Sequence, residues 1–417
     1  MVEGRDEEGN VGVPIVVPVE DKVVDGMASR GGGGSSNSIE VSTLGSLNHS
    51  SPHKAESPSE SNSNTLLQNL TKLRVLILDG LNMSGIDVSG LRNLSPSLQV
   101  LSLSSCNEEL AGYLPESTWN SSLKVLDLSS TGFSGVLPES IGDLHSLEIL
   151  WLYHCNFNGS IPSSIGNLTR LARLELSFNE LSGQLRTSSM ENLIIIDLNS
   201  NLIQGPFLPP SLPNLVLIFS LASNRVSGYI PGSICEMKGL QILDLSGNNF
   251  TGTIPQCLGN ISDSLLLLDL QENGLFGTIS LTFGKNAVLR SLHLNGNKFE
   301  GLLPRSVINC TQLEALVLSG NKLNDTFPRW LETLPSLRVL VLRSNRLHGS
   351  IGNPRTEFPF PQLRILDLSS NELTGPLPST YFVNLKAMIS TDQDGSKLRY
   401  MDQGYYQDSI NVIDERT

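Results

Sequence analysis

The sequence is poor in the features that mark membrane-spanning, nucleic-acid-binding and disulfide-framework proteins. No apolar run reaches the roughly 18 residues that a membrane helix needs, so we expect no membrane span in this chain. Basic residues number 28 against 41 acidic ones, and the net charge of −13 argues against binding to nucleic acid or an anionic membrane. With only 5 cysteines in 417 residues, the fold does not depend on a dense disulfide framework.

The sequence also lacks the common catalytic and cofactor motifs. It contains no Gly-x-Ser-x-Gly, no His-Glu-x-x-His and no phosphate-binding glycine loop, and its 6 histidines are scattered. Asp392-Gln-Asp-Gly395 is similar to the start of a calcium loop but lacks the remaining ligands, which favours a simple turn. We therefore expect a protein that is not an enzyme, with no cofactor, no metal site and no catalytic residue.

One stretch, Leu240–Pro255, recurs along the chain. It reads Leu-x-x-Leu-x-Leu-x-x-Asn-x-Phe-x-Gly-x-Ile-Pro. Thirteen copies follow one another at intervals of 22 to 26 residues, and their opening residues are Leu73, Leu98, Leu123, Leu147, Leu171, Leu193, Val216, Leu240, Leu265, Leu289, Leu313, Leu337 and Leu363. A fixed period of this length with this pattern is typical of leucine-rich repeats.

The pattern predicts how each copy folds. The apolar fourth and sixth positions alternate with other residues, as in a strand with one buried face. A single copy is too small to bury that face, so stacking of successive copies must supply the core. We expect a right-handed α/β solenoid, a leucine-rich-repeat superhelix with a parallel concave β-sheet and an irregular or short-helical outer side.

The ninth position is Asn in nine copies, and we expect these side chains to form a buried ladder that bonds to the backbone where the strand ends. The nine residues are Asn179, Asn201, Asn224, Asn248, Asn273, Asn297, Asn321, Asn345 and Asn371. The first four copies carry Leu81, Cys106, Thr131 and Cys155 instead. Leucine cannot form these hydrogen bonds, so we expect a weakened first coil.

The repeat form resembles the extracellular leucine-rich repeats of plant receptor-like kinases, receptor-like proteins and polygalacturonase inhibitors. Ser233-Ile-Cys-Glu-Met, Ile254-Pro-Gln-Cys-Leu and Tyr381-Phe-Val-Asn-Leu-Lys-Ala-Met388 make it most similar to receptor-like proteins that include the Cf-type disease-resistance receptors. The resemblance implies a non-catalytic ectodomain in plant defence or peptide signalling, with a peptide or protein ligand and a partner receptor kinase. It also implies a location at the outer face of the plasma membrane.

Two alternatives remain open at this stage. One is an inhibitor of a secreted cell-wall-degrading enzyme, similar to the polygalacturonase inhibitors, and the other is a degenerate truncated fragment. Residues 1–65 are acidic and rich in Gly and Ser, which predicts a disordered leader. Residues 66–382 form the solenoid, and residues 383–417 form an irregular tail resembling the entry to a receptor island region. Relative to the family we expect a chain truncated at both ends, without a signal peptide.

Two cysteines have a spacing that allows a disulfide. Cys235 and Cys257 are 22 residues apart, close to one repeat, on the outer side of neighbouring coils. Free thiols are the alternative.

Eleven Asn-x-Ser/Thr sequons occur, and several fall on the flank of the repeat, away from the strand. The candidate glycosylation sites are Asn69, Asn82, Asn120, Asn158, Asn167, Asn249, Asn260, Asn309 and Asn324. Turn residues without a glycan are the alternative interpretation.

The outward strand positions predict two candidate ligand-binding zones on the concave face. In the fourth and fifth coils an aromatic zone consists of Trp151, Tyr153, His154, Arg173, Glu175 and Phe178. In the ninth to twelfth coils a charged zone consists of Asp269, Gln271, Glu272, Arg290, His293, Glu314, Arg338 and Arg343. Exposed aromatics with Arg are frequent anchors in protein recognition, whereas an ordinary solvated face is the alternative for both zones.

Overall fold

The computed structural model describes residues 72–82, 95–106, 110–116, 119, 122–183, 190–206 and 214–389. All of these residues except 383–389 belong to the repeat block predicted at 66–382. The predicted leader at 1–65, the sequon residues Asn69 and Asn120, and the tail beyond residue 389 lie outside the described residues.

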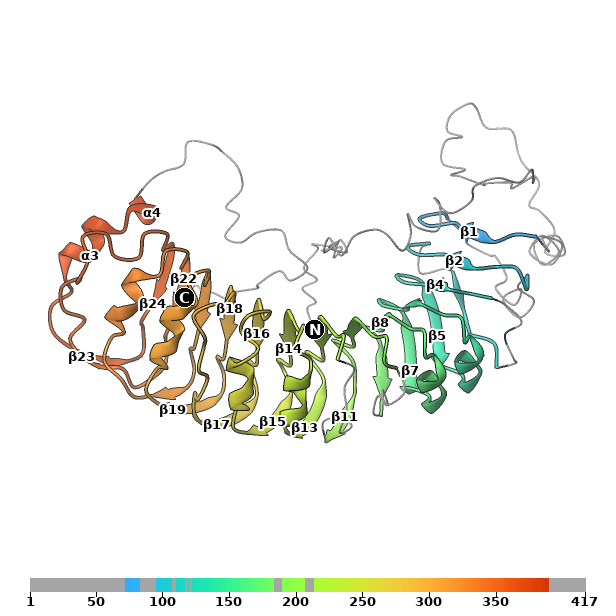
Figure 1. Ribbon diagram of the computed structural model, residues 1–417, viewed down its shortest axis with the longest axis horizontal. Helices are drawn as coiled ribbons and strands as arrows, with labels where there is room; N and C mark the ends of the chain where they lie inside the picture. The colour runs from blue at the N-terminus through green and yellow to red at the C-terminus, as the bar shows by residue number, and fades with distance from the viewer. Residues whose placement is uncertain are drawn as a thin grey trace, which may run out of the picture. The chain divides into compact units, whose positions relative to one another are not determined.

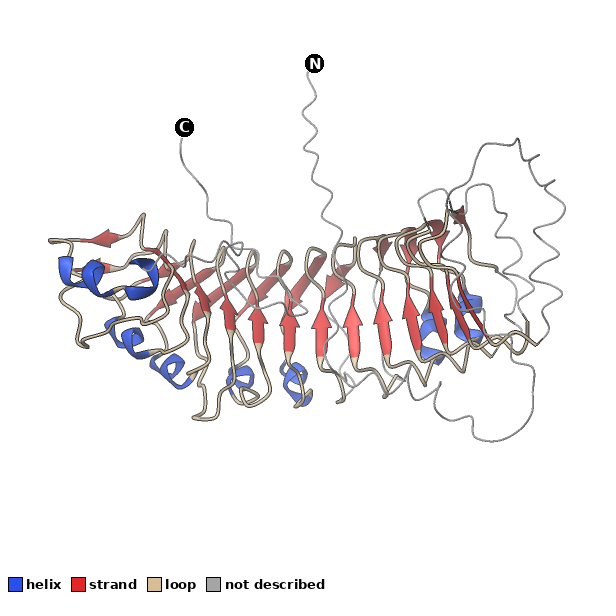
Figure 2. Ribbon diagram, turned by 90° about the horizontal axis from the view of Figure 1, so that it is seen from above, coloured by secondary structure: helices blue, strands red, loops and turns tan. Residues whose placement is uncertain are grey.

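One parallel sheet of 13 strands runs through the repeat block, with one strand from each copy in chain order (Figures 1 and 2). Each strand starts two residues after the opening residue of its copy. The strands are β1 (Val75–Ile77), β2 (Val100–Ser102), β4 (Val125–Asp127), β6 (Ile149–Trp151), β8 (Arg173–Glu175), β10 (Ile195–Asp197), β12 (Ile218–Ser220), β14 (Ile242–Asp244), β16 (Leu267–Asp269), β18 (Ser291–His293), β20 (Ala315–Val317), β22 (Val339–Val341) and β24 (Ile365–Asp367). The predicted solenoid with a parallel sheet is therefore confirmed.

The core lies behind this sheet, as the apolar pattern predicts. Leu240, Leu243 and Leu245 are fully buried, and their counterparts in the other coils join one continuous hydrophobic cluster. Each coil contributes only a few side chains, and the cluster exists because neighbouring coils stack. The alternation leaves Ile242 and Asp244 on the opposite face of β14, and we call this face of the sheet the inner face.

Short strands also pair along the flank of the coils. They form three smaller parallel sheets, which we call the lateral sheets. Their members are β3 (Ala111–Gly112), β5 (Gly132–Val136), β7 (Asn156–Ser160) and β9 (Glu180–Ser182); β11 (Gln204–Pro206), β13 (Arg225–Tyr229), β15 (Asn249–Gly252), β17 (Gly274–Thr278), β19 (Lys298–Gly301) and β21 (Lys322–Leu323); and β23 (His348–Gly349) and β25 (Glu372–Leu373).

On the outer side, six of the described coils carry a short 3₁₀ helix. The helices are η2 (Glu139–Asp143), η3 (Ser163–Asn167), η4 (Gly232–Glu236), η5 (Gln256–Gly259), η6 (Arg305–Asn309) and η7 (Arg329–Thr333). Each follows directly on the Pro of the Gly-x-Ile-Pro segment. In η2, for example, the Ile141 N–H donates to the Pro138 carbonyl at 3.1 Å. Proline suits this position because the first residues of a helix need no N–H partner within it.

The nine ladder asparagines share one hydrogen-bond pattern that ties neighbouring coils together. Asn248 Nδ2 donates to Leu221 O of the preceding coil at 2.8 Å and to Leu245 O of its own coil at 3.2 Å. Its Oδ1 accepts from the Val226 N–H of the preceding coil at 3.0 Å. The other eight residues repeat these three contacts.

Substitutes at the ladder position keep part of this pattern. The buried thiols of Cys106 and Cys155 lie 2.9 Å from Leu78 O and 3.1 Å from Leu128 O, the carbonyls that Asn would reach in the preceding coil. Thr131 Oγ1 donates to Leu128 O of its own coil at 2.5 Å. The Leu81 side chain is exposed and offers no polar atom, so the weakened first coil remains a prediction.

The chain continues past the expected end of the solenoid in two short helices, α3 (Ser379–Asn384) and α4 (Lys386–Ile389). The boundary that we assign at residue 382 falls inside α3, and Leu385 separates α3 from α4. Tyr381 and Leu385 are buried, and the Tyr381 hydroxyl donates to the buried carboxylate of Glu332. Tyr381 also packs against Phe327 and Phe360, so α3 covers the outer side of the last coils.

Candidate functional site

In five of the coils that the structure describes, an inner-face Asp closes the end of its own strand. Asp127 Oδ1 accepts from the Ser129 N–H at 2.9 Å and from the Ser129 hydroxyl at 2.6 Å. Asp244 bonds to Ser246 and Asp367 to Ser369 in the same way. The frequent Asp-Leu-Ser sequence therefore has a structural role, as a local cap that is repeated from coil to coil.

The fourth and fifth coils depart from this arrangement. Trp151 in β6 and Glu175 in β8 are aligned in the register of the sheet, and the Trp151 Nε1–H donates to Glu175 Oε1 at 3.0 Å. These two side chains therefore form a hydrogen bond between neighbouring coils. In contrast, Asp at the same repeat position bonds within its own coil. Arg173 lies on the same strand as Glu175.

The environment of Glu175 favours its neutral form. Burial raises the pKa of this carboxyl, and the nearby charge of Asp197 on the next strand raises it further. The hydrogen bond from Trp151 and the charge of Arg173 act in the opposite direction, and the resulting pKa is about 7. A carboxyl on the inner face thus titrates near neutral pH.

Three further rings of the aromatic zone lie next to one another. The imidazole of His154 stacks on the ring of Phe178, with centroids 4.2 Å apart and planes 9° from parallel, and Tyr153 meets His154 edge-on at 6.5 Å. Phe178 keeps 47% of its surface exposed. Burial lowers the pKa of His154 and raises that of Tyr153. The structure therefore brings all predicted members of the aromatic zone onto neighbouring coils.

His154 and Phe178 also occupy a backbone position with a conformational restriction. The eighth residue of every repeat has a positive φ. The residues are Gly80, Ser105, Ser130, His154, Phe178, Ser200, Ser223, Gly247, Glu272, Gly296, Gly320, Ser344 and Ser370. Ten of these thirteen are Ser or Gly, and a bulky side chain is unusual in this region of backbone space. The preference for Ser or Gly at the eighth position can be seen in the sequence, but the positive φ that explains it is seen only in the structure.

The charged zone separates into two sets of contacts. The His293 ring nitrogen Nδ1 lies 3.3 Å from Asp269 Oδ2, and both side chains are buried. Glu314 is shared by two arginines, with Arg338 at 3.0 Å and Arg290 at 3.8 Å.

Several of these charged residues thus link coils to one another. Arg290, Glu314 and Arg338 each occupy the second position of their repeat. Lys124 and Glu148 occupy the same position in two earlier coils and form an ion pair at 3.1 Å, so ion pairs at this position connect coils in two parts of the block. Glu272, by contrast, is exposed and lies against Gly296 of the next coil, and Arg343 is half-buried. These contacts favour a structural role for Arg290, Glu314 and Arg338.

The described sequon asparagines lie off the inner sheet. Asn158 and Asn249 are exposed residues of the lateral strands β7 and β15, and Asn324 directly follows β21. Asn167 ends η3, Asn260 follows η5, and Asn309 ends η6, where its Nδ2 donates to Phe283 O at 2.8 Å. Asn82 is exposed in the first coil.

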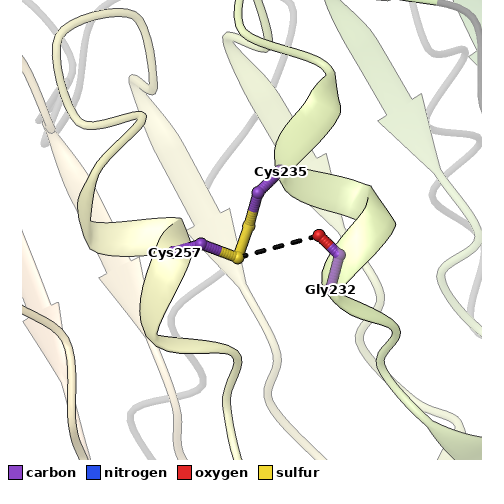
Figure 3. Close-up of a disulfide and its surroundings, with 3 residues drawn as sticks. All are labelled: Gly232, Cys235 and Cys257. Carbon is purple, nitrogen blue, oxygen red and sulfur yellow. Dashed lines mark hydrogen bonds between the residues drawn. A yellow bond between two sulfur atoms is a disulfide. The ribbon is translucent and has the colours of Figure 1, made fainter.

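Cys235 in η4 and Cys257 in η5 are joined by a disulfide in the structure, with Cα atoms 5.9 Å apart (Figure 3). Cys106, Cys155 and Cys310 are buried free thiols. In the part of the chain that the structure describes, no three His, Cys, Asp or Glu side chains are grouped to hold a metal ion. In that same part, no helix combines the length and the apolar character needed to cross a bilayer.

Family profiles of leucine-rich repeats match the chain in three parts of the repeat block. The profile described as "Leucine-rich repeat region" matches residues 80–205, and those described as "Leucine Rich Repeat" and "Leucine rich repeat" match 239–261 and, in two overlapping segments, 287–347 and 311–373.

Among solved structures, the chain is similar to "Plant peptide hormone receptor RGFR1 in complex with RGF2". The TM-score is 0.67 with 31% identity over 77% of this chain and 51% of that one. It is also similar to "Crystal structure of PEPR1-AtPEP1", with a TM-score of 0.64, 29% identity and coverage of 76% of this chain and 48% of that one.

Two curated relatives are proteins of Arabidopsis thaliana. Receptor-like protein 54 is 38% identical over 315 residues, which cover 75% of this chain and 36% of that protein. Receptor-like protein 53 is 36% identical over 251 residues, 59% of this chain and 26% of that protein. The chain thus spans well under half the length of these relatives. It belongs to the leucine-rich-repeat family, in the form carried by the plant receptor-like proteins.

Proposed function

We propose that the repeat block recognises a peptide or protein ligand on its inner sheet, with the aromatic zone as the main contact surface. The observation that carries this proposal is the placement of two adjacent large side chains, His154 and Phe178, at left-handed positions. Ten of the thirteen copies have Ser or Gly there. Left-handed backbone costs any residue with a Cβ atom about 1–2 kcal/mol, so what sets these two copies apart is that they place aromatic rings at this position, where the other described copies have Ser, Gly or Glu.

The chemistry of the zone suits a ligand with both apolar and polar groups. The exposed face of Phe178 and the neighbouring rings offer rigid apolar area, which is frequent at the centres of protein interfaces. Glu175 and Arg173 lie beside them and can orient polar groups of the ligand. This surface differs from that of the five coils in which an inner-face Asp forms hydrogen bonds within its own coil.

The comparisons support a peptide as the class of ligand. RGFR1 is described as a plant peptide hormone receptor in complex with RGF2, and the other similar structure is described as PEPR1-AtPEP1. By analogy we extend the proposal to a cell-surface location, a role in defence or peptide signalling, and a partner receptor kinase. Membership of the Cf-type class is part of the same proposal.

A peptide-display selection against the full chain would test this function. Selected peptides are then titrated against wild type and the variants Trp151→Ala and His154→Ser/Phe178→Ser. Truncating a central aromatic anchor should weaken binding by roughly 2 kcal/mol, about 30-fold. The matched control is Arg338→Ala in the charged zone, which should leave the affinity unchanged.

The control also distinguishes the two zones. If peptides bind the aromatic-zone variants as tightly as wild type but lose affinity for Arg338→Ala, the contact surface is in the charged zone. Inhibition of a cell-wall-degrading enzyme by the purified chain would instead support the inhibitor alternative.

A further inference from the structure

Three exposed apolar side chains on the lateral sheets each have a sequon asparagine directly or diagonally opposite them in the next coil. All three occupy the x position of Gly-x-Ile-Pro, where the side chain points outward from the lateral sheet. The pairs are Val136 with Asn158, Tyr229 with Asn249, and Leu302 with Asn324. We propose that the glycans attached to these asparagines pack over the apolar side chain of the preceding coil, so that each pair is one modification site.

The first pair is in direct register. Val136 of β5 and Asn158 of β7 are cross-strand partners, and both side chains are exposed, Val136 to 59%. Neighbouring strands are about 4.8 Å apart. The first sugar of a glycan on Asn158 therefore starts within van der Waals reach of the valine methyl groups.

The third pair has the same arrangement at the end of a strand. Gly301 pairs with Leu323, and the Asn324 N–H donates to Gly301 O at 2.9 Å. This hydrogen bond extends the register by one residue and sets Asn324 beside Leu302. Leu323 is buried, whereas Asn324 and Leu302 are exposed, Leu302 to 65%.

In the second pair the apolar residue is a tyrosine. Tyr229 of β13 is opposite Thr251 of β15, which is the hydroxyl residue of the Asn249-Phe-Thr sequon. Asn249 is therefore diagonal to Tyr229, at about 8 Å given the strand spacing and the rise of two residues. The Tyr229 ring leans toward that coil, because a Cβ on Gly252 would lie 2.4 Å from its Cδ1 atom. With 73% of the residue exposed, the ring offers a face to a sugar on Asn249.

The x position is polar or proline in most coils that have no sequon next to them. Seven such residues are exposed: Ser160, Pro206, Thr253, Thr278, Thr326, Ser350 and Pro376. Tyr113 is the exception, being 74% exposed without a described sequon residue beside it in the following coil. Apolar side chains at this position thus coincide with sequons in three of four described cases.

Physical chemistry explains why the two features occur together. An exposed apolar side chain gains stability when it is removed from water, in proportion to the area covered. The C–H faces of a sugar ring can cover it without a protein partner, while the sugar hydroxyls stay hydrated. The aromatic face of Tyr229 offers the largest flat area for such a contact.

A double-mutant cycle on the Tyr229–Asn249 pair would test the proposal. The full chain is expressed behind a secretory signal, and glycan occupancy at each sequon is measured by mass spectrometry of the peptides. We expect Asn249→Gln to lower the thermal midpoint by about 2 °C or more in the wild-type background. In the Tyr229→Thr background the same substitution should have little effect, because the ring that the glycan covers is gone. Threonine occurs naturally at this position in the next two coils, so the variant should fold.

Asn167→Gln serves as the matched control, since Asn167 ends η3 on the outer side and is away from the lateral strands. It should give equal midpoint changes in the two backgrounds. The proposal is overturned if Asn249 carries no glycan in the secreted chain. It is also overturned if Asn249 is occupied but its substitution has the same effect with and without the Tyr229 ring. Neither result depends on the ligand proposed for the inner sheet.

Discussion

The imidazole of His154 lies flat against the ring of Phe178, 4.2 Å away, although the two residues are 24 positions apart in the chain. Both residues have left-handed backbone, with φ of 51° and 53°. The stack therefore results from two features at once: the repeat period, which places the residues side by side, and a backbone bend that directs both side chains to the same side of the sheet.

This stack allows a structural role to be distinguished from a binding role. Replacing both residues with Ser, as in His154→Ser/Phe178→Ser, loses about 0.5–1.5 kcal/mol of ring stacking. The cost of left-handed backbone stays in the variant, because it arises at the Cβ atom that serine also has. We expect the free energy of unfolding, measured by urea denaturation, to fall by no more than about 1.5 kcal/mol. A loss of several kcal/mol would mean that the rings belong to the structural core and would weaken the case for a ligand site.

The pKa of Glu175 predicts a pH dependence of stability. Its carboxyl has a pKa of about 7 in the folded chain, against 4.5 for a free glutamate. Between these values the folded state binds a proton that the unfolded state has released, so stability falls as pH rises from about 4.5 to about 7. The total change from this residue is at most about 3 kcal/mol.

Glu175→Gln should remove this part of the pH dependence, which urea denaturation across the range would measure. Asp197 also has a raised pKa, because it is buried, so some slope should remain in the variant. A slope identical to that of wild type would show that Glu175 is ionised throughout the range in the folded chain.

The Asn ladder predicts a large effect from a single substitution far from the aromatic zone. Asn248→Ala removes the donor to Leu221 O and the acceptor of the Val226 N–H, and the backbone groups stay buried. Buried groups left without partners cost about 1–3 kcal/mol, and the thermal midpoint should fall accordingly. Lys298→Ala, at an exposed position of β19, is a control that should change the midpoint little. Equal effects from the two variants would contradict the ladder's role.

The disulfide between Cys235 and Cys257 predicts a specific pattern of thiol reactivity. Alkylation of the denatured, unreduced protein should label Cys106, Cys155 and Cys310 but neither of the other two, and peptide mapping should recover Cys235 linked to Cys257. Closing a loop of 22 residues stabilises a chain by about 3 kcal/mol. The Cys235→Ser/Cys257→Ser variant should therefore unfold at a lower urea concentration, whereas labelling of all five cysteines would show that no bridge forms.

Much of the fold can be predicted from the sequence, because each feature depends on a pattern within one repeat. Leucines at the fourth and sixth positions, such as Leu243 and Leu245, define which face of the strand is buried. Asn248 and its counterparts mark the end of the strand. The 22 to 26 residue period then requires that equivalent strands pair in parallel, since each coil can bury its apolar face only against the next.

The same reasoning locates the aromatic zone but not its chemistry. The period places Trp151 beside Glu175, and the structure adds the hydrogen bond and the burial that raise the pKa of the carboxyl. It also shows that the charges of Arg290, Glu314 and Arg338 pair with one another. These properties depend on side-chain direction and on neighbours from other coils, which a one-dimensional pattern does not contain.

By itself, then, the sequence determined the solenoid, its parallel inner sheet and the faces on which its variable residues lie, because hydrophobic periodicity acts locally and identically in every coil. Only the tertiary structure decided that the bulky residues His154 and Phe178 have left-handed backbone, that sequon asparagines lie beside exposed apolar side chains, and that α3 packs onto the last coils. Each of these depends on backbone angles or on contacts between different coils, and such contacts form only when the coils stack.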